Sequence, residues 1–477
     1  MFIDYEIVQI IVECTNQKAQ KYYEEWNNKN SNKQRQWQPV DSVEMYATFG
    51  ILIIAGALKA NRESIHFLWT KKSLFSRPIF PASMSRDRFV SIIRFIRFDD
   101  FTTRIERRKL DKLAPFRNVF EKFVAHCKEN YLPNSHLTVD EQLVAFRGKC
   151  PFRVYMKSKP AKYGIKIWAL VDNDSTYALN LQIYTGKEGN KPEKDQGKRV
   201  VLDLVEGIGT GYGITTDNFF TSIPLASELL NRKLTLCGTM RKNKQDIPPV
   251  LLPHRSRTEM SSVFAFKDKY TLVSYVPAKN KAVILLSTEH HDDKITGDET
   301  DYKPEIIIHY NATKGSVDTM DKMVNEYSIK RSTRRWPFVL FQNTIDIACL
   351  NSFVLWITKN PQLSKTAPHK RREFLLDMGQ QLIKPYVERR LHSGVTFHKR
   401  TANAMYDFIG TLDPGPSSRV DDNQKSMGRC VLCPRKYDKK SRSKCDKCKN
   451  FVCPNHHVTK KTKICSKCHL MDPEYSN

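Results

Sequence analysis

Apolar positions at helical spacing dominate the first 135 residues. The first apolar stripe consists of Ile7, Ile10, Ile11 and Cys14, which share one face of a helix. The same spacing recurs over residues 45–58, 86–98 and 116–127. Pro78 and Pro81 interrupt the chain between the runs at 45–58 and 86–98. The pattern therefore predicts a mainly helical region over residues 1–135.

The pattern changes to strand character after Pro133. Stretches rich in Ile, Leu, Val and Tyr predict strands at 137–146, 165–171 and 177–184, and shorter apolar runs predict strands at 213–216 and 234–239. Helices are expected between them, at 196–205 and 225–230. This order predicts an α/β layer with a mixed sheet. It is compatible with the RNase H type of fold, which periodicity alone cannot select.

Residues 245–304 interrupt this alternation and are interpreted as a small β-rich insertion, with strands at 270–276 and 282–287. A strand at 305–310, a turn at Lys314 and Gly315, and a helix from about Val317 are then expected. A further helical block should cover 337–391, and the DPGPSS-containing stretch at 411–427 has the composition of a linker.

Charge narrows the range of partners. The 477 residues include 78 Lys and Arg against 51 Asp and Glu, a net charge of +27. Such an excess predicts salt-dependent attraction to a polyanion. The apolar stretch at 49–58 is too short to cross a bilayer, and no membrane partner is expected. The first residues carry acidic rather than basic charge and lack the secretory pattern.

Acidic residues stand out on this basic background. Asp140 lies on the first predicted strand, Asp217 directly follows another, and Asp318 and Asp321 share a face of the helix from Val317. Strand alternation places Glu141 on the face opposite to Asp140. If the four aspartates lie close together in the fold, they could bind two Mg²⁺ or Mn²⁺ ions, which prefer oxygen ligands. Two such ions can promote cleavage of a phosphodiester. The alternative is that each is a turn former or helix cap.

The C-terminal tail has the spacing of a zinc module. Seven of the twelve cysteines lie between residues 430 and 468. Four pairs with two-residue spacers suit two tetrahedral Zn²⁺ ions. The candidate ligands are Cys430, Cys433, Cys445, Cys448, Cys453, His456, Cys465 and Cys468. A cross-brace would join the first pair to the third and the second to the fourth; spacing alone does not fix the pairing, and His457 could replace His456.

Five segments resemble the piggyBac transposases. They are LTVDEQLVAFRGKCPFR at 137–153, KPAKYGIK at 159–166, TDNFFTSIPLA at 216–226, YNATKGSVDTMD at 310–321 and RWP at 335–337. The resemblance, which runs from near residue 1 to near residue 470, implies an RNase H-like core in which Asp140, Asp217 and Asp318 form the catalytic triad, with Asp321 as an additional acidic residue. It also implies DNA cutting through hairpin intermediates, joining at TTAA targets, and a homodimer that pairs two transposon ends.

The resemblance also divides the chain. It implies a helical dimerisation and DNA-binding region in two parts (1–135 and 329–410), a catalytic core in two parts (136–244 and 305–328), the insertion (245–304), the linker (411–427) and the Cys-rich module (428–470). That module is expected to recognise transposon-end DNA, with a protein-binding role as the rival. A long acidic N-terminal segment, common in the family, is not in this sequence, and whether a longer chain carries one is left open.

Candidate DNA contacts follow from charge and position. Cations close to Asp140 could hold phosphates, each positioning the duplex rather than reading its sequence. The segment at 239–244 resembles a family segment that engages target DNA. Trp336 could stack on an unpaired base, with burial in the core as the alternative. The full set of candidates is Arg147, Arg153, Lys157, Lys162, Asn218, Arg241, Lys244, Arg331, Arg334, Arg335 and Trp336.

Two functions remain open at this stage. The first is an active nuclear DNA transposase, favoured by the four intact aspartates. The second is a domesticated DNA-binding or chromatin-associated descendant that no longer transfers strands. Basic residues between Arg435 and Lys444 favour DNA as the partner of the tail and could also serve as a nuclear localisation signal.

Overall fold

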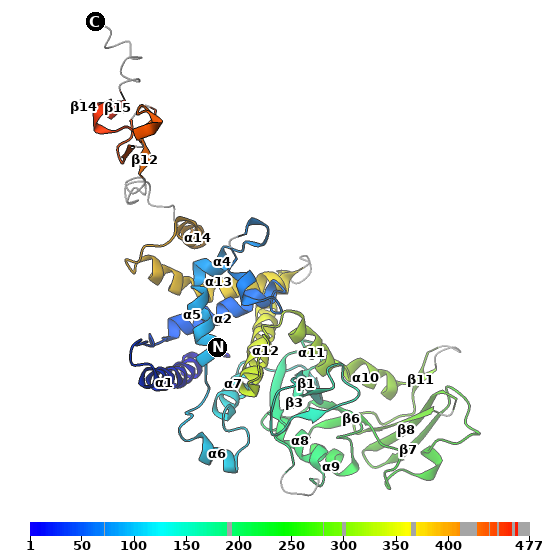
Figure 1. The fold of residues 1–477 in the computed structure, drawn as a ribbon. Coiled ribbons are helices and arrows are strands. Elements are labelled where there is room, and N and C mark those ends of the chain that lie inside the picture. Colours follow the sequence, from blue (N-terminus) through cyan, green and yellow to red (C-terminus); the bar gives the residue numbers. More distant parts are fainter. Residues whose placement is uncertain are drawn as a thin grey trace. The chain divides into compact units, whose positions relative to one another are not determined.

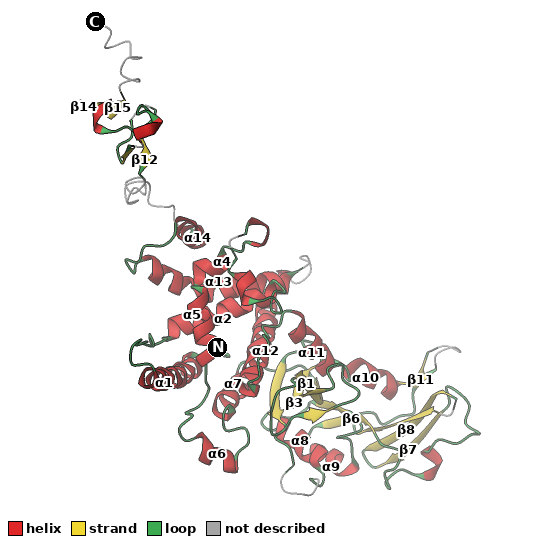
Figure 2. Cartoon of the chain, viewed as in Figure 1, coloured by secondary structure: helices red, strands yellow, loops and turns green. Residues whose placement is uncertain are grey.

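A computed structural model describes residues 1–70, 72–187, 193–279, 281–297, 302–363, 369–410, 427–437, 439–445, 448–459 and 463–465. The chain forms two compact units, Met1–Ile409 and Gly410–Asn477. In the first unit, a helical part adjoins a sheet with helices packed beside it (Figures 1 and 2). Nearly all of the predicted linker, 411–426, lies outside the described residues.

The centre of the first unit is a mixed sheet, as the sequence predicts. Its strands follow the order β2-β3-β1-β5-β6-β9-β8-β7, and β4 pairs with β3. β1 is antiparallel to β3 and parallel to β5, which is itself parallel to β6. The core strands are β1 (His136–Ala145), β2 (Val154–Tyr155), β3 (Tyr163–Asp172), β4 (Ala178–Ile183), β5 (Gly213–Thr216) and β6 (Thr235–Thr239). α8 (Gln196–Leu204) and α9 (Ile223–Asn231) connect them where helices were expected.

The strands of the predicted insertion extend this same sheet. β9 (Lys281–Ser287) pairs with core strand β6, and β8 (Tyr270–Ala278) pairs with β9. A third strand, β7 (Ser262–Lys267), was not expected from the sequence; it forms the outer edge next to β8. Two short strands, β10 (Ile295–Thr296) and β11 (Lys303–Pro304), pair separately.

The strand expected at 305–310 is wrong: this segment begins helix α10 (Glu305–Thr313). Its three consecutive isoleucines suggested a strand, but tertiary packing decides otherwise. As a helix, the segment brings Ile306, Ile307 and Tyr310 onto one face, where they pack against Val273 and Leu285 of the sheet. A strand would have turned alternate side chains away from that cluster. The next helix, α11 (Ser316–Glu326), begins where expected.

The helical part combines segments from both ends of the unit. Its helices are α1 (Tyr5–Lys29), α2 (Ser42–Ala57), α3 (Ile65–Leu68), α4 (Ile79–Ser83), α5 (Arg86–Phe95), α6 (Arg104–Leu110), α7 (Arg117–Glu129), α12 (Trp336–Lys359), α13 (Lys370–Leu391) and α14 (Lys399–Ile409). α2 and α13 cross where Gly50 faces Gly379. A methyl group on Gly50 would lie 2.6 Å from the Gly379 carbonyl oxygen, so the close approach requires glycine.

α12 forms the core of the helical part. It is the one helix in the described part of the chain that is long and apolar enough to cross a membrane, but 83% of its most apolar stretch is buried within the protein. Its buried polar residues contact other elements: Asn343 donates to Gln142 on β1, and Asn351 donates to the Ala178 carbonyl on β4. These contacts are those of a core helix.

The C-terminal unit is small and contains short paired strands. They are β12 (Gly428–Arg429), β13 (Lys440–Ser441), β14 (His457–Thr459) and β15 (Lys463–Cys465). β12 pairs with β13, and β14 pairs with β15. Its buried apolar cluster contains Cys445 and Val452, with Leu432 and Cys448 packed against them. So small a core needs another source of stability, such as a metal or disulfides.

Candidate functional site

Asp140 and Asp217 meet at one edge of the sheet. β1 and β5 run parallel, with Val139 level with Thr216. The residues that follow, Asp140 and Asp217, therefore emerge side by side. One carboxylate oxygen from each lies within 4.8 Å of the other and of an oxygen of Glu141. Apolar residues hold this edge in place, since Val139 is buried in the main core.

Glu141 was not expected in this group, because strand alternation places it on the face of β1 opposite to Asp140. Its carboxylate joins Asp140 and Asp217 in the same group. The physical reason is the end of the neighbouring strand. β5 pairs with β1 only from His136 to Val139, so β1 has no β5 neighbour beyond that point. The long Glu141 side chain can bend through this open edge, which the alternation rule does not consider.

Asp140 is a partly buried acid with two other carboxylates beside it. Burial raises the pKa of Asp140 to about 8, and the charges of Glu141 and Asp217 act in the same direction. Burial also raises the pKa of Asp217. A divalent cation among these oxygens would favour their charged forms. The donor set consists of carboxylate oxygens, which fits Mg²⁺ or Mn²⁺.

Asp318 lies near this group but is held by a different partner. Its side chain is 69% exposed and projects from α11, which packs against β1. The ammonium group of Lys159 lies 3.1 Å from Asp318 Oδ1 and 3.1 Å from the Glu141 carbonyl oxygen. Lys159 thus connects the third aspartate to the strand that carries the first.

Asp321 takes part in an amide network. Its Oδ1 accepts a hydrogen bond from Gln142 at 2.8 Å and another from Asn325 at 3.0 Å. Gln142 accepts in turn from Asn343 of α12 at 3.0 Å. The structure thus brings Asp140, Asp217 and Glu141 together, places Asp318 beside them through Lys159, and directs Asp321 toward Gln142. Gln142 was missed in the sequence, although its position two residues after Asp140 places it on the same strand face.

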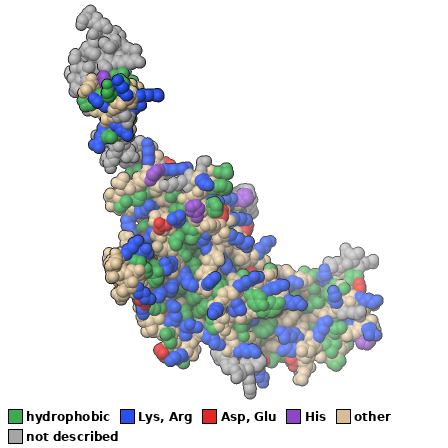
Figure 3. Space-filling model, in the orientation of Figure 1, with side chains coloured by type: hydrophobic (Ala, Val, Ile, Leu, Met, Phe, Trp, Pro, Cys, Tyr) green, Lys and Arg blue, Asp and Glu red, His purple; other side chains and the backbone are tan. Residues whose placement is uncertain are grey.

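Several of the predicted DNA contacts line a basic cavity. The cavity measures about 1020 Å³, and Arg147, Lys149 and Arg334 are among the cations in its wall. Its lining also includes Arg62, Lys330 and Arg331. Lys and Arg side chains are spread over the face of the protein seen in Figure 3. Arg153 is exposed nearby and donates to the carbonyl oxygens of Arg147 and Gly148, which fixes the bend after β1.

Three of the candidates are engaged in packing. Arg335 donates to the carbonyl oxygens of Ile93 and Ile96, and burial lowers its pKa to about 10. Arg331 donates to the carbonyl oxygens of Ala60 and Glu63. Trp336 is only 8% exposed and packs edge-on against Phe152, with 5.0 Å between the ring centroids. The two arginines join the segment before α12 to the first part of the helical region. For Trp336, the structure shows the alternative considered above, burial in the core.

The remaining candidates lie on the surface. Lys157, Lys162 and Lys244 are exposed. Asn218, directly after Asp217, is also exposed, and its Oδ1 accepts from Arg241 at 3.3 Å. Arg241 therefore reaches back from the end of β6 to the edge that carries the carboxylates.

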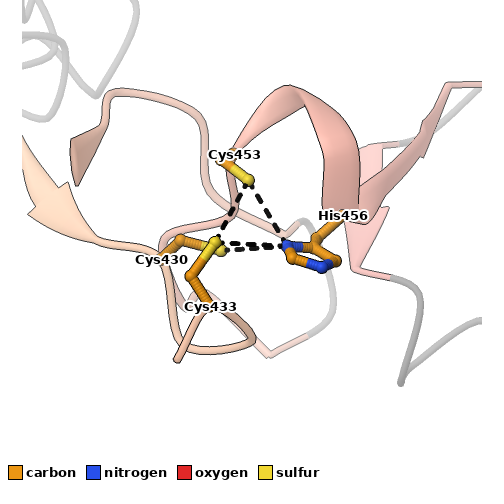
Figure 4. A group of neighbouring side chains, drawn as sticks. All are labelled: Cys430, Cys433, Cys453 and His456. Atoms are coloured by element: carbon orange, nitrogen blue, oxygen red, sulfur yellow. Dashed lines mark hydrogen bonds between the residues drawn. The ribbon is translucent and has the colours of Figure 1, made fainter. Parts of the chain in front are cut away.

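The C-terminal unit contains a compact group of sulfur and nitrogen ligands. Cys430, Cys433, Cys453 and His456 point toward one another (Figure 4). The Sγ atoms of Cys433 and Cys453 are 3.7 Å apart, and their distances to His456 Nδ1 are 3.5 and 3.4 Å. A tetrahedron with Zn–S near 2.3 Å and Zn–N near 2.0–2.1 Å requires separations of about 3.8 and 3.5 Å. The group therefore fits one Zn²⁺ ion.

This group joins the first predicted pair to the third, as a cross-brace requires. Cys445 and Cys448 lie together in the small apolar cluster of the unit. Cys468 and the side chain of Cys465 lie outside what the structure describes, so the pairing of the second with the fourth remains a prediction.

Comparison with known proteins gives consistent matches. A family model described as Transposase IS4 matches residues 1–353. The human PiggyBac transposable element-derived protein 3 is 22% identical over 471 residues, covering 94% of this chain and 73% of that protein. The human PiggyBac transposable element-derived protein 2 is 22% identical over 374 residues, covering 74% of this chain and 60% of that protein.

A solved structure matches almost the whole chain. It is the cryo-EM structure of a piggyBac transposase synaptic complex with hairpin DNA. The match has a TM-score of 0.80 and 35% sequence identity, and it covers 98% of this chain and 95% of the other.

Proposed function

The chain belongs to the piggyBac family of transposases, and from this we propose that it is a metal-dependent DNA transposase that cuts and rejoins transposon ends at TTAA sites. One observation carries the proposal. Asp140 of β1 and Asp217, directly after β5, lie side by side where the parallel pairing of these two strands stops, with Asp318 close by. That arrangement suits phosphodiester chemistry on an RNase H-like core.

The carboxylates would act as ligands. Asp140 and Asp217 would hold one Mg²⁺ or Mn²⁺ ion, and Asp318 would contribute to a second. Two such ions, when bound, activate the attacking hydroxyl and stabilise the leaving oxygen. Asp321 does not need to touch metal, because its hydrogen bond with Gln142 holds α11 against β1. The order of steps, first nicking and then hairpin formation, follows from the family.

DNA would be held by the basic surfaces. We assign backbone contacts to the 1020 Å³ cavity, whose wall includes Arg147 and Arg334. Loss of one phosphate contact lowers the salt dependence of binding by about one unit of slope. The zinc module would bind transposon ends, and a homodimer would pair two of them. We place the protein in the nucleus, where its DNA substrate is located.

A domesticated role is the second candidate, because two of the matching human proteins are named as transposable element-derived. Such a protein would bind DNA without cutting it. Terminal repeats and TTAA on both sides of the coding sequence would favour the active enzyme.

The test is a nicking and hairpin assay on duplexes that carry the terminal repeats flanking the gene, with added Mg²⁺ or Mn²⁺. Wild type should cut. Asp140→Asn and Asp217→Asn should bind the duplex with unchanged affinity and cut at least about 100-fold more slowly. Asp377→Asn removes an exposed carboxylate on α13 and should behave as wild type. Binding without cutting by the wild type would support the domesticated role instead.

A further inference from the structure

A second group of metal-ligating side chains lies at the opposite end of the strands. His136 is the first residue of β1, Glu289 follows the end of β9, and His309 lies on α10. One ligand atom from each lies within 4.8 Å of the others. The pairing of β1 with β5 begins at His136 and stops just before Asp140 and Asp217. The length of β5 therefore separates this group from the carboxylates.

The distances are close to those of a coordination site. Nε2 of His136 lies 2.8 Å from Glu289 Oε1, and Nε2 of His309 lies 3.9 Å from Glu289 Oε2. Tetrahedral zinc with bonds near 2.0–2.1 Å requires ligand separations of about 3.3 Å. These two distances differ from that value by only about 0.5–0.6 Å. All three side chains are partly exposed, which leaves an entry path for an ion.

The ligand atom of His309 has no hydrogen-bond partner among the described residues. This atom, Nε2, is buried. A buried polar atom without a partner is costly, and native proteins rarely leave one unexplained. A cation bound by this nitrogen would supply the missing interaction.

Outer hydrogen bonds hold the other two ligands. Ser135 Oγ lies 2.9 Å from Nδ1 of His136, and Thr235 donates to Glu289 Oε2 at 3.2 Å. Such contacts orient metal ligands through their second atoms. The backbone at Gly213 also leaves the required space, because a methyl group there would lie 2.6 Å from the His136 ring and 3.0 Å from Glu289.

We propose that His136, Glu289 and His309 form a Zn²⁺ site with a fourth position open to water. Two imidazoles and a carboxylate are ligands that zinc commonly takes. The ion would join the end of β9 to the first core strand and to α10, which leads into the helix that carries Asp318. The group lies away from the carboxylates at Asp140 and Asp217, so the ion would take no part in cutting DNA.

Metal content of the full-length protein tests the site. After dialysis against zinc-free buffer, the wild type should retain about one zinc ion more per chain than Glu289→Gln or His309→Ala. Glu289→Gln can still hydrogen bond with His136, so it should fold even if His309→Ala does not. His254→Ala removes an exposed histidine outside the group and should leave the zinc content unchanged.

Cobalt substitution separates this site from the cysteine cluster. In a Cys430→Ser, Cys445→Ser, Cys448→Ser, Cys453→Ser background, which removes thiolates from both expected zinc groups of the tail, Co²⁺ should give weak visible bands without the strong near-ultraviolet thiolate absorption. Glu289→Gln should remove these bands. Equal zinc content in the wild type, Glu289→Gln and His309→Ala would overturn the proposal, leaving a hydrogen-bonded His–Glu pair. Neither measurement depends on DNA cutting, so failure of the site would not bear on the transposase activity.

Discussion

The ammonium group of Lys159 lies 3.1 Å from the carboxylate of Asp318. The same ammonium donates to the Glu141 carbonyl, so it occupies the space between α11 and β1. A divalent cation bound by Asp318 would compete with this lysine for the same oxygens. Lys159 therefore affects how readily Asp318 can serve as a metal ligand.

Replacing Lys159 with alanine should lower the metal concentration needed for cutting. Two unit charges about 4 Å apart in water interact by about 1 kcal/mol, which corresponds to roughly a five-fold change in affinity. We expect the Mn²⁺ concentration at half-maximal cutting to fall by about that factor. Lys128→Ala removes an exposed cation on α7 and should leave this concentration unchanged. An unchanged or higher metal requirement in Lys159→Ala would show that the lysine does not compete with the ion.

Zinc removal should unfold the C-terminal unit before the first unit. Its four-ligand group is joined to only a few buried apolar residues, so metal binding supplies much of its folding free energy. Cys453→Ser should reduce bound zinc and abolish the chelator-sensitive step in protease digestion, because the unit is then already open. Cys349→Ser, a buried thiol of α12 outside the cluster, is the control for loss of a thiol. A protease pattern that chelator does not change in the wild type would contradict this expectation.

Asp346 should make stability depend on pH. It is buried on α12, where Ser328 donates to Oδ2 at 2.6 Å and the Ile329 amide donates to Oδ1 at 2.8 Å. Burial raises its pKa from 3.8 to about 7, despite the nearby charge of Lys330. Because the pKa of Asp346 is higher in the folded state than in the unfolded state, the protonated acid stabilises the fold. This contribution is fully present below about pH 4, near the unfolded pKa. It is lost as pH rises through about 7.

Asp346→Asn should remove this decline. The amide keeps the shape of the acid and cannot ionise, so the variant should gain stability relative to wild type between about pH 5 and pH 8, by on the order of a few kcal/mol. The measurement is the melting temperature at several pH values. Asp377→Asn, an exposed acid on α13, should follow the wild-type curve. Parallel curves for wild type and Asp346→Asn would show that Asp346 stays ionised.

The placement of Asp140 and Asp217 could be predicted because local patterns determine it. Each lies just after apolar residues: Asp140 follows Val139 within β1, and Asp217 comes directly after β5. Parallel neighbours then bring the two side chains to one edge. The spacing of the cysteine pairs is local in the same way. Their pairing is not, and the group at Cys430 joins the first pair to the third, a choice that spacing left open.

What could not be predicted depends on distant contacts. Whether Glu141 turns toward Asp140 depends on where β5 stops, and the pairing of Lys159 with Asp318 joins residues 159 positions apart. The segment at 305–310 has strand composition, yet a cluster on the sheet accepts it only as a helix. Likewise, His136, Glu289 and His309 are so far apart in sequence that no spacing rule connects them.

The crossing of α2 and α13 gives the sharpest test of the helical part. A methyl group on Gly50 would lie 2.6 Å from the carbonyl oxygen of Gly379 and 2.8 Å from Cγ1 of Ile383. The carbonyl belongs to a helix backbone and cannot move alone, so Gly50→Ala should force the two helices apart. Overpacking costs typically 1–3 kcal/mol, and the better helix propensity of alanine returns at most about 1 kcal/mol.

We therefore expect Gly50→Ala to lower the free energy of unfolding by about 1–2 kcal/mol, measured by urea denaturation. Gly315→Ala is the matched control, because its φ of −93° is open to any residue and no heavy atom lies within 4 Å of the added methyl group. Gly50 belongs to the helical segment that precedes the core in the sequence, and Gly379 to the helical segment that follows it. A loss confined to Gly50→Ala would thus show in solution that the two flanking segments fold as one body, whereas equal stability of both variants would show that they do not meet this closely.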